Sequence, residues 1–182
     1  MADNYPNFMN KVKQYQQVLQ NTLDFRVEWV TLKELIMNKL SALNEISKLG
    51  ALVEVRDDFE NMEAIVFDLG IEESGISSRL NHNIKKALVK NRGTLVYQQL
   101  FNGKVMVLIQ YPSIEGFGEQ RQPKTISIYR PDEISEPFIV RHLEEFMQEI
   151  LTWEDYDDNA PQKIGFTNQA LLADQAPPPL QV

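Results

Sequence analysis

Hydrophobic residues recur every three or four positions along the first fifty residues, which is the spacing of one face of a helix. The members of the first stripe are Phe8, Val12, Tyr15 and Leu19. Polar residues, mainly Gln, Asn and Lys, fill the positions between them, so the stripe is as narrow as a coiled-coil seam. The stripe loses phase after residue 20. The pattern therefore predicts a helix over 7–20 and a break within 21–26.

A second amphipathic stripe follows and carries start and stop signals. Thr31 and Glu34 have the spacing of a capping box, whose side chains accept hydrogen bonds from free N–H groups at a helix start. Gly50 stands where helices commonly end in a left-handed residue. These signals predict a second helix over 32–49.

The clearest strand signal is a pair of runs rich in Val, Leu, Ile, Tyr and Phe, at 94–101 and 104–111. Asn102 and Gly103 separate them, and an Asn-Gly pair favours the two-residue type I′ turn of a hairpin. Residues 124–130 alternate between apolar and polar positions, so we expect them to form a third strand of the same sheet.

Two shorter runs, 52–56 and 63–69, also predict strands. Four apolar residues then recur at four-residue steps: Ile76, Leu80, Ile84 and Leu88. This spacing predicts a helix over 77–91. A final amphipathic stripe after Ser135 predicts a last helix that ends near residue 151.

The predicted fold class is α+β, in the order α-α-β-β-α-β-β-β-α, with a central antiparallel sheet. The sequence divides into an N-terminal helical segment at 1–30, an α+β domain at 31–153 and a tail at 154–182. The tail begins with an acidic run and ends in Pro177, Pro178 and Pro179, which cannot join a ladder or a helix.

Composition excludes several functional classes. The chain has 182 residues, no Cys and a formal net charge of −8. Without Cys there is no disulfide scaffold, thiolate metal site or Cys nucleophile. No apolar run approaches 18 residues, so we expect neither a membrane span nor secretion, and therefore a cytoplasmic protein.

Candidate catalytic and metal-binding residues are few. His142 and His82 are the two histidines, and each fits an ordinary helix residue. The acidic run after Glu154 resembles the start of an EF-hand loop, but Ala160 and Phe166 replace the required glycine and glutamate. We therefore expect no enzyme activity, no metal and no cofactor.

One charge pattern is unusual for an acidic protein. No Asp or Glu occurs between Ser74 and Ile114, although the chain carries 26 of them. The same segment holds six cations, which are the candidate binding residues: Arg79, Lys85, Lys86, Lys90, Arg92 and Lys104. On the predicted helix, three of them share a stripe, and Lys104 lies at the hairpin tip. A helix followed by a hairpin is the local order of a winged-helix nucleic-acid reader.

A basic face on an acidic protein equally suits an acidic partner or a second copy of the chain. We therefore expect a non-enzymatic protein that binds a protein partner as an adaptor, assembly factor or inhibitor, and that forms a homo-oligomer through its N-terminal helices. Two alternatives stay open. The first is a nucleic-acid-binding protein that uses the helix and the hairpin tip. The second is an acidic inhibitor that occupies the basic nucleic-acid channel of a partner.

Overall fold

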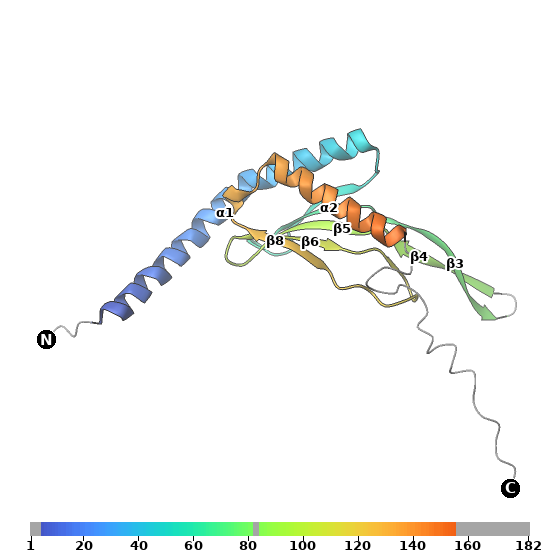
Figure 1. Cartoon of the computed structure of the whole chain (residues 1–182), viewed down its shortest axis with the longest axis horizontal. Coiled ribbons are helices and arrows are strands. Elements are labelled where there is room, and N and C mark those ends of the chain that lie inside the picture. The colour runs from blue at the N-terminus through green and yellow to red at the C-terminus, as the bar shows by residue number, and fades with distance from the viewer. Residues whose placement is uncertain (1–4, 82–83, 156–182) are drawn as a thin grey trace, which may run out of the picture.

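The computed structural model describes residues 5–81 and 84–155 and shows an elongated α+β arch (Figure 1). Two helices lie over one face of an antiparallel sheet, and two long elements project beyond it on opposite sides. In chain order the elements are α1 (Pro6–Ser47), β1 (Leu52–Arg56), β2 (Ala64–Asp68), β3 (Ile71–Asn81), β4 (Ile84–Asn91), β5 (Thr94–Gln99), β6 (Val105–Gln110), β7 (Ser113–Ile114), β8 (Lys124–Tyr129), a 3-10 turn (Pro131–Glu133) and α2 (Glu136–Glu154).

The strands form two sheets. The larger has five strands in the order β1-β2-β5-β6-β8, and the smaller has three in the order β3-β4-β7. Every pairing between these strands is antiparallel. The structure thus confirms an α+β fold with antiparallel sheets and a C-terminal helix, and it places strands at 52–56, 64–68 and 124–129 close to the predicted positions.

The prediction of two N-terminal helices is wrong, because α1 is one continuous helix of 42 residues. No Gly or Pro occurs between Asn7 and Leu49, so nothing in the backbone stops the helix where the stripe loses phase. Side-chain bonds bridge that region: Gln17 donates to Asn21 at 2.8 Å, and Gln20 donates to Asp24 at 2.9 Å. The apolar residues therefore move to another face of α1 in this region, but the helix does not end there.

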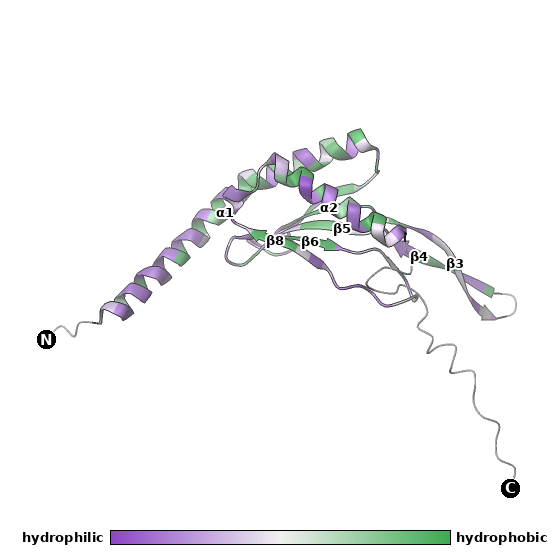
Figure 2. Ribbon diagram, viewed as in Figure 1, coloured by the Kyte–Doolittle hydropathy of each residue, from purple (hydrophilic) through white to green (hydrophobic). Residues whose placement is uncertain are grey.

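The hydrophobic core lies between the five-stranded sheet and the two helices. The second half of α1 contributes Trp29, Leu32, Ile36 and Leu40, and α2 contributes Ile139, Leu143, Phe146 and Ile150. Alternate residues of the central strands face them, which is why Figure 2 shows these strands as hydrophobic. Phe67 and Phe146 meet edge to face, with ring centroids 6.2 Å apart.

The predicted helix over 77–91 is also wrong, because this segment forms the β3–β4 hairpin. A four-residue step places side chains on one face of a helix, but it also places them on one face of a strand. The repeat that begins at Ile76 therefore fits both structures. Gly75 has positive φ and lies at the irregularity of β3 between Glu73 and Ser77, and Gly93 has positive φ and follows β4.

The β5–β6 hairpin pairs residues 94–99 with 105–110, but its turn differs from the predicted one. The N–H of Gly103 donates to the carbonyl of Leu100 at 2.8 Å, and the N–H of Leu100 donates to the carbonyl of Lys104 at 2.8 Å. Gly103 has φ 78°, whereas Asn102 is not among the positive-φ residues. This is a three-residue loop with a glycine bulge rather than a two-residue type I′ turn.

The β5–β6 turn also holds α1 against the sheet. Arg26 donates to the carbonyl of Phe101 at 3.0 Å, and Gly103 lies directly under the helix. Residues 6–21 of α1 precede this contact and project beyond the sheet (Figure 1). We call residues 6–21 the arm.

Because Gly103 lies against α1, adding a side chain there should destabilise the fold. A Cβ at this position would stand 2.7 Å from the Cβ of Phe25 and 2.9 Å from the carbonyl oxygen of Thr22. We expect Gly103→Ala to lower the free energy of unfolding by about 3 kcal/mol, from backbone strain plus overpacking. Gly50→Ala is the matched control, since Gly50 also has positive φ but has nothing within 4 Å of its added Cβ. Its effect should be about 1 kcal/mol by urea denaturation. Equal effects would contradict this contact.

Candidate functional site

The six predicted binding cations do not form one surface. Arg79, Lys85 and Lys86 lie in the outer part of the β3–β4 hairpin, whereas Lys90 and Arg92 lie at its base. Lys104 follows the β5–β6 turn, at the opposite end of β5 from Arg92. The predicted helical stripe does not exist, because the segment that carries it is two strands.

The cations at the base of the hairpin are engaged in structural contacts. The ammonium of Lys90 lies 2.5 Å from Glu154 and 3.1 Å from Glu72, and 5.4 Å from the ring centroid of Trp153. Burial disfavours its charge, but the hydrogen bonds to the two carboxylates outweigh burial and raise the pKa of Lys90. Arg92 donates to the carbonyl of Leu69 at 3.2 Å. Lys90 thus ties the smaller sheet to α2, and it is not available to a ligand.

The cations near the hairpin tip have a different environment. Arg79 and Lys85 are direct cross-strand partners, and both are exposed. No carboxylate in residues 5–81 or 84–155 lies within 4 Å of either cation. Like charges that face each other across a strand pair destabilise a hairpin. Lys86 has one distant carboxylate, Glu115, at 3.7 Å.

The surface of the arm carries the apolar stripe that the sequence predicts. The exposed fractions of Phe8, Tyr15 and Leu19 are 64%, 64% and 49%, respectively. Further exposed apolar residues continue the surface along α1: Met9, Val18, Leu23, Val27 and Val30. On average, Phe8, Tyr15, Leu19, Leu23 and Val30 lie about a quarter turn from the face of α1 that packs on the sheet, whereas Val18 lies in line with that face and Met9 and Val27 lie opposite it. The same helix therefore has one apolar face in the core and another in solvent.

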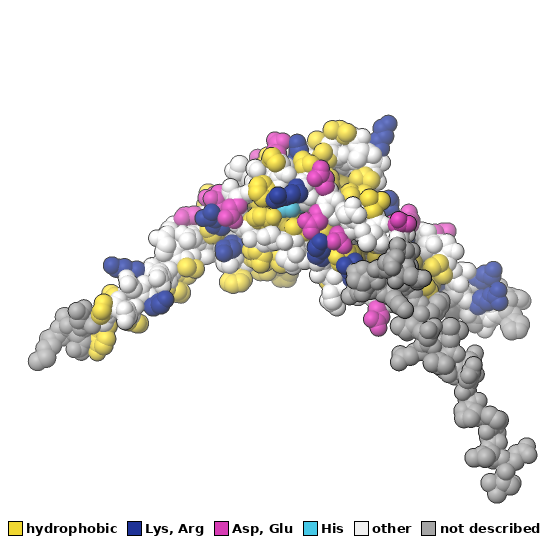
Figure 3. Space-filling view, in the orientation of Figure 1, with side chains coloured by type: hydrophobic (Ala, Val, Ile, Leu, Met, Phe, Trp, Pro, Cys, Tyr) yellow, Lys and Arg dark blue, Asp and Glu magenta, His cyan; other side chains and the backbone are white. Residues whose placement is uncertain are grey.

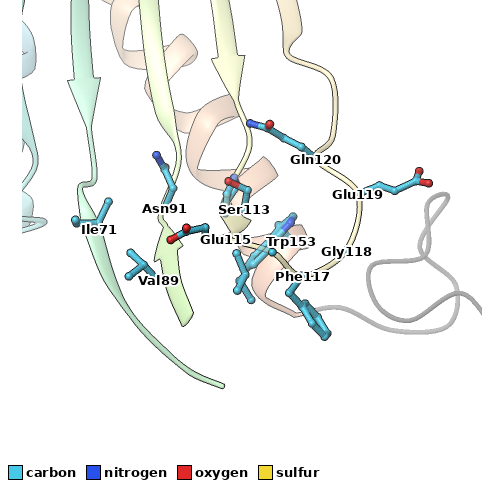
Figure 4. A pocket seen from close by; sticks show the side chains of 13 residues that line it. Ile71, Val89, Asn91, Ser113, Glu115, Phe117, Gly118, Glu119, Gln120 and Trp153 are labelled. Carbon is cyan, nitrogen blue, oxygen red and sulfur yellow. The ribbon is translucent and has the colours of Figure 1, made fainter. Parts of the chain in front are cut away.

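A pocket lies between the smaller sheet, the loop after β7 and the end of α2 (Figure 4). Its volume is about 380 Å³, and Ile71, Val89 and Trp153 contribute apolar walls. Glu115 and Glu119 are its acidic residues, and both are exposed.

A cluster of ionised groups on α2 and β8 was not predicted from the sequence. Lys124 lies 2.7 Å from Glu149 and 2.8 Å from Glu145, and Tyr111 donates to Glu149 at 3.1 Å. Burial acts to raise the pKa of Glu149, but the bonds from Lys124 and Tyr111 outweigh it and lower that pKa. Because every charge in the cluster is paired, its role is to fasten α2 to the sheet edge.

His142 is a buried structural residue, with 1% of its surface exposed. Its Nδ1 lies 3.2 Å from the hydroxyl of Tyr97, and its Nε2 lies 3.0 Å from the hydroxyl of Tyr129. The neutral ring can satisfy both hydroxyls, donating from one nitrogen and accepting at the other. His82 lies outside the described residues, as does the tail from residue 156 onward.

The described residues contain no group of three or more His, Asp or Glu side chains placed to hold a metal ion. Within the same residues, neither helix combines the length and hydropathy needed to cross a bilayer. Searches against protein-family models, curated proteins and solved structures found no match to this chain.

The burial of His142 predicts a pH-dependent stability. Desolvation, reinforced by the charge of Arg141 and partly opposed by Glu145, lowers the pKa of His142 from 6.5 to about 4. Between these two values the unfolded chain binds a proton that the folded chain does not, so stability falls as the pH falls. We expect a loss of about 3 kcal/mol between pH 7 and pH 4 from this residue.

Urea unfolding of the natural chain and of His142→Gln across that pH range measures this effect. Subtracting the two curves removes the contribution of the carboxylates. The difference should shrink as the pH falls from 6.5 to 4. Two parallel curves would show that His142 takes up its proton as readily in the folded protein as in the unfolded chain.

Proposed function

We propose that the protein is a non-enzymatic assembly or adaptor protein that acts through protein–protein contacts, beginning with copies of itself. The observation that carries the proposal is the exposed apolar stripe of the arm. Burying one Val, Leu or Phe side chain is favourable by roughly 1.5–3 kcal/mol. An arm that exposes Phe8, Tyr15, Leu19 and their neighbours therefore gains several kcal/mol from any partner that covers it.

The arm also needs a partner to be a stable helix. Most helical stability in proteins comes from packing of an apolar face rather than from intrinsic propensity. Within the arm, side-chain support comes from polar bonds such as that from Lys11 to Gln14, at 3.1 Å, and such exposed pairs contribute only about 0.2–0.5 kcal/mol each. A covering partner would supply the packing that the arm lacks within its own chain.

The spacing of the stripe indicates that it runs straight along α1, so that a partner can lie along the helix. Phe8, Leu19 and Val30 are separated by 11 residues each, and Val12 and Leu23 repeat the same step. An 11-residue repeat corresponds to 3.67 residues per turn, which keeps the stripe almost parallel to the helix axis. The stripe can then contact one straight partner surface from residue 8 to residue 30.

Removing the stripe should dissociate the oligomer. We expect the natural chain to have a mass in solution that is a multiple of 21.0 kDa, measured by light scattering at micromolar concentration. The double substitution Tyr15→Ser and Leu19→Ser should reduce the mass to that of one chain. Asn10→Ser with Gln14→Ser is the matched control, because it places the same residue type on the opposite face of the arm. If the natural chain is already a monomer, the proposed self-association is wrong.

A second candidate function is anion binding by the β3–β4 hairpin, with nucleic acid as the ligand. The cross-strand pair of Arg79 and Lys85 favours it, because phosphates between the two side chains would relieve their mutual repulsion. The hairpin projects from the end of the arch opposite the arm (Figure 1), so it can reach a ligand without hindrance from the body.

Charge reversal at the hairpin tests this second function. Arg79→Glu with Lys85→Glu should abolish retention on heparin at low salt and reduce the salt dependence of nucleic-acid binding by about one unit per lost cation. The control, Lys48→Glu with Arg141→Glu, changes the net charge equally at other exposed sites. Should the two variants elute together, the hairpin does not bind anions.

A further inference from the structure

The five-stranded sheet has one face that no described helix covers. Both helices pack on the face that carries Ile65, Phe67 and Tyr97. The opposite face carries a separate apolar cluster of Ala64, Val66 and Val96, with Leu108 packed against it. In Figure 3, hydrophobic side chains gather on the lower side of the arch, both beneath the sheet and along the arm.

A groove runs over this open face. Its floor consists of the short side chains of Ala64, Val66 and Val96, and its volume is about 280 Å³. Phe59 and Met62, from the β1–β2 connection, form one wall and are 72% and 46% exposed. The three floor side chains are buried, and Arg56, Gln98 and Gln110 complete the lining, so the depression accepts a large side chain from a partner.

The arm and the β1–β2 connection beside the groove have opposite charges, while the groove lining itself contains Arg56 as well as Asp58. The arm contains Lys11 and Lys13 and no acidic residue. The β1–β2 connection beside the groove contains three exposed acidic residues: Asp57, Asp58 and Glu60. Complementary charges of this kind guide two surfaces together and fix their register.

A single chain cannot bring these two surfaces together. The arm continues α1 without a break, and the second half of α1 is fixed on the covered face of the sheet. To reach its own open face, the arm would have to break the helix at a position where nothing interrupts it. Contact between the arm and the groove is therefore possible only between two chains.

We propose that the arm of one copy lies in the groove on the open sheet face of a second copy, and that the second arm lies reciprocally on the first. This inference rests on the self-association proposed above and specifies its geometry. Such an exchange is isologous, so it closes as a two-fold dimer. It buries the arm, Phe59 and Met62 in one contact, and it places Lys11 and Lys13 beside the acidic connection.

Site-directed cross-linking tests the exchange directly, because the natural chain has no cysteine. One full-length chain carries Tyr15→Cys and the other carries Phe59→Cys, and the mixture is treated with a flexible bismaleimide. We expect the mixed pair to cross-link in high yield. Phe101→Cys replaces Phe59→Cys as the control, because Phe101 is 74% exposed but lies on the β5–β6 turn beside α1. The control pair should remain largely uncross-linked.

The double substitution Phe59→Ser with Met62→Ser provides a second readout. It should raise the dimer dissociation constant by about tenfold or more while the circular dichroism spectrum stays unchanged. A natural chain that is monomeric would overturn both the self-association and the exchange. A different outcome would overturn only the exchange: a dimer that needs Tyr15 and Leu19 but whose dissociation constant is unchanged by the substitutions at Phe59 and Met62. In that dimer, two Tyr15→Cys chains would cross-link to each other and not to a Phe59→Cys chain. That result would instead show arms paired with arms.

Discussion

The packing of Leu32, Ile36 and Leu40 on the five-stranded sheet fixes the position of α1, and the rest of the molecule depends on it. Ile36 and Leu40 are fully buried, so the second half of the helix cannot move relative to the sheet. A helix that is held at one end and continuous throughout must project at the other. The arm is the direct consequence of that packing, and so is its inability to fold back.

The same packing determines which surfaces face solvent. Within residues 5–81 and 84–155, both helices cover one face of the sheet, and the opposite face keeps a small apolar cluster with no helix above it. Beside that buried cluster, Phe59 and Met62 are exposed, and contiguous exposed apolar surface marks a binding site more often than it marks a defect. The packing of α1 thus leaves one apolar face of the arm in solvent and leaves one face of the sheet without a described helix over it. The basic hairpin lies apart from both, which is why it is a second and independent candidate.

Several parts of the fold follow from the sequence, and others cannot. Strand pairing at 94–99 and 105–110 was predictable, because β-rich runs flank a glycine turn. The segment from Ile76 to Leu88 was not, because a four-residue repeat fits one face of a helix and one face of a strand equally well. The break expected near residue 21 failed for another reason, since a shift of the apolar face does not end a helix that contains no Gly or Pro.

The candidate site was predictable in part as well. The stripe at Phe8, Tyr15 and Leu19 could be found from its spacing, but its exposure depends on where the sheet ends. The predicted stripe of cations was wrong, because the segment expected to form the helix that carries it forms the β3–β4 hairpin. The groove wall at Phe59 and Met62 was missed, although two apolar residues inside an acidic connection are a detectable signal. The partners of Lys90 come from α2 and β3, and only the tertiary fold brings them together.

Amide hydrogen exchange over residues 6–21 at two protein concentrations tests most directly whether another chain stabilises the arm. An arm that packs on a second copy should exchange slowly at high concentration and rapidly after dilution below the dissociation constant. Residues 32–40 serve as the internal reference, because they are buried within their own chain and should stay protected at both concentrations. If the arm exchanges at the same rate at both concentrations, no second copy covers it, and the account is contradicted.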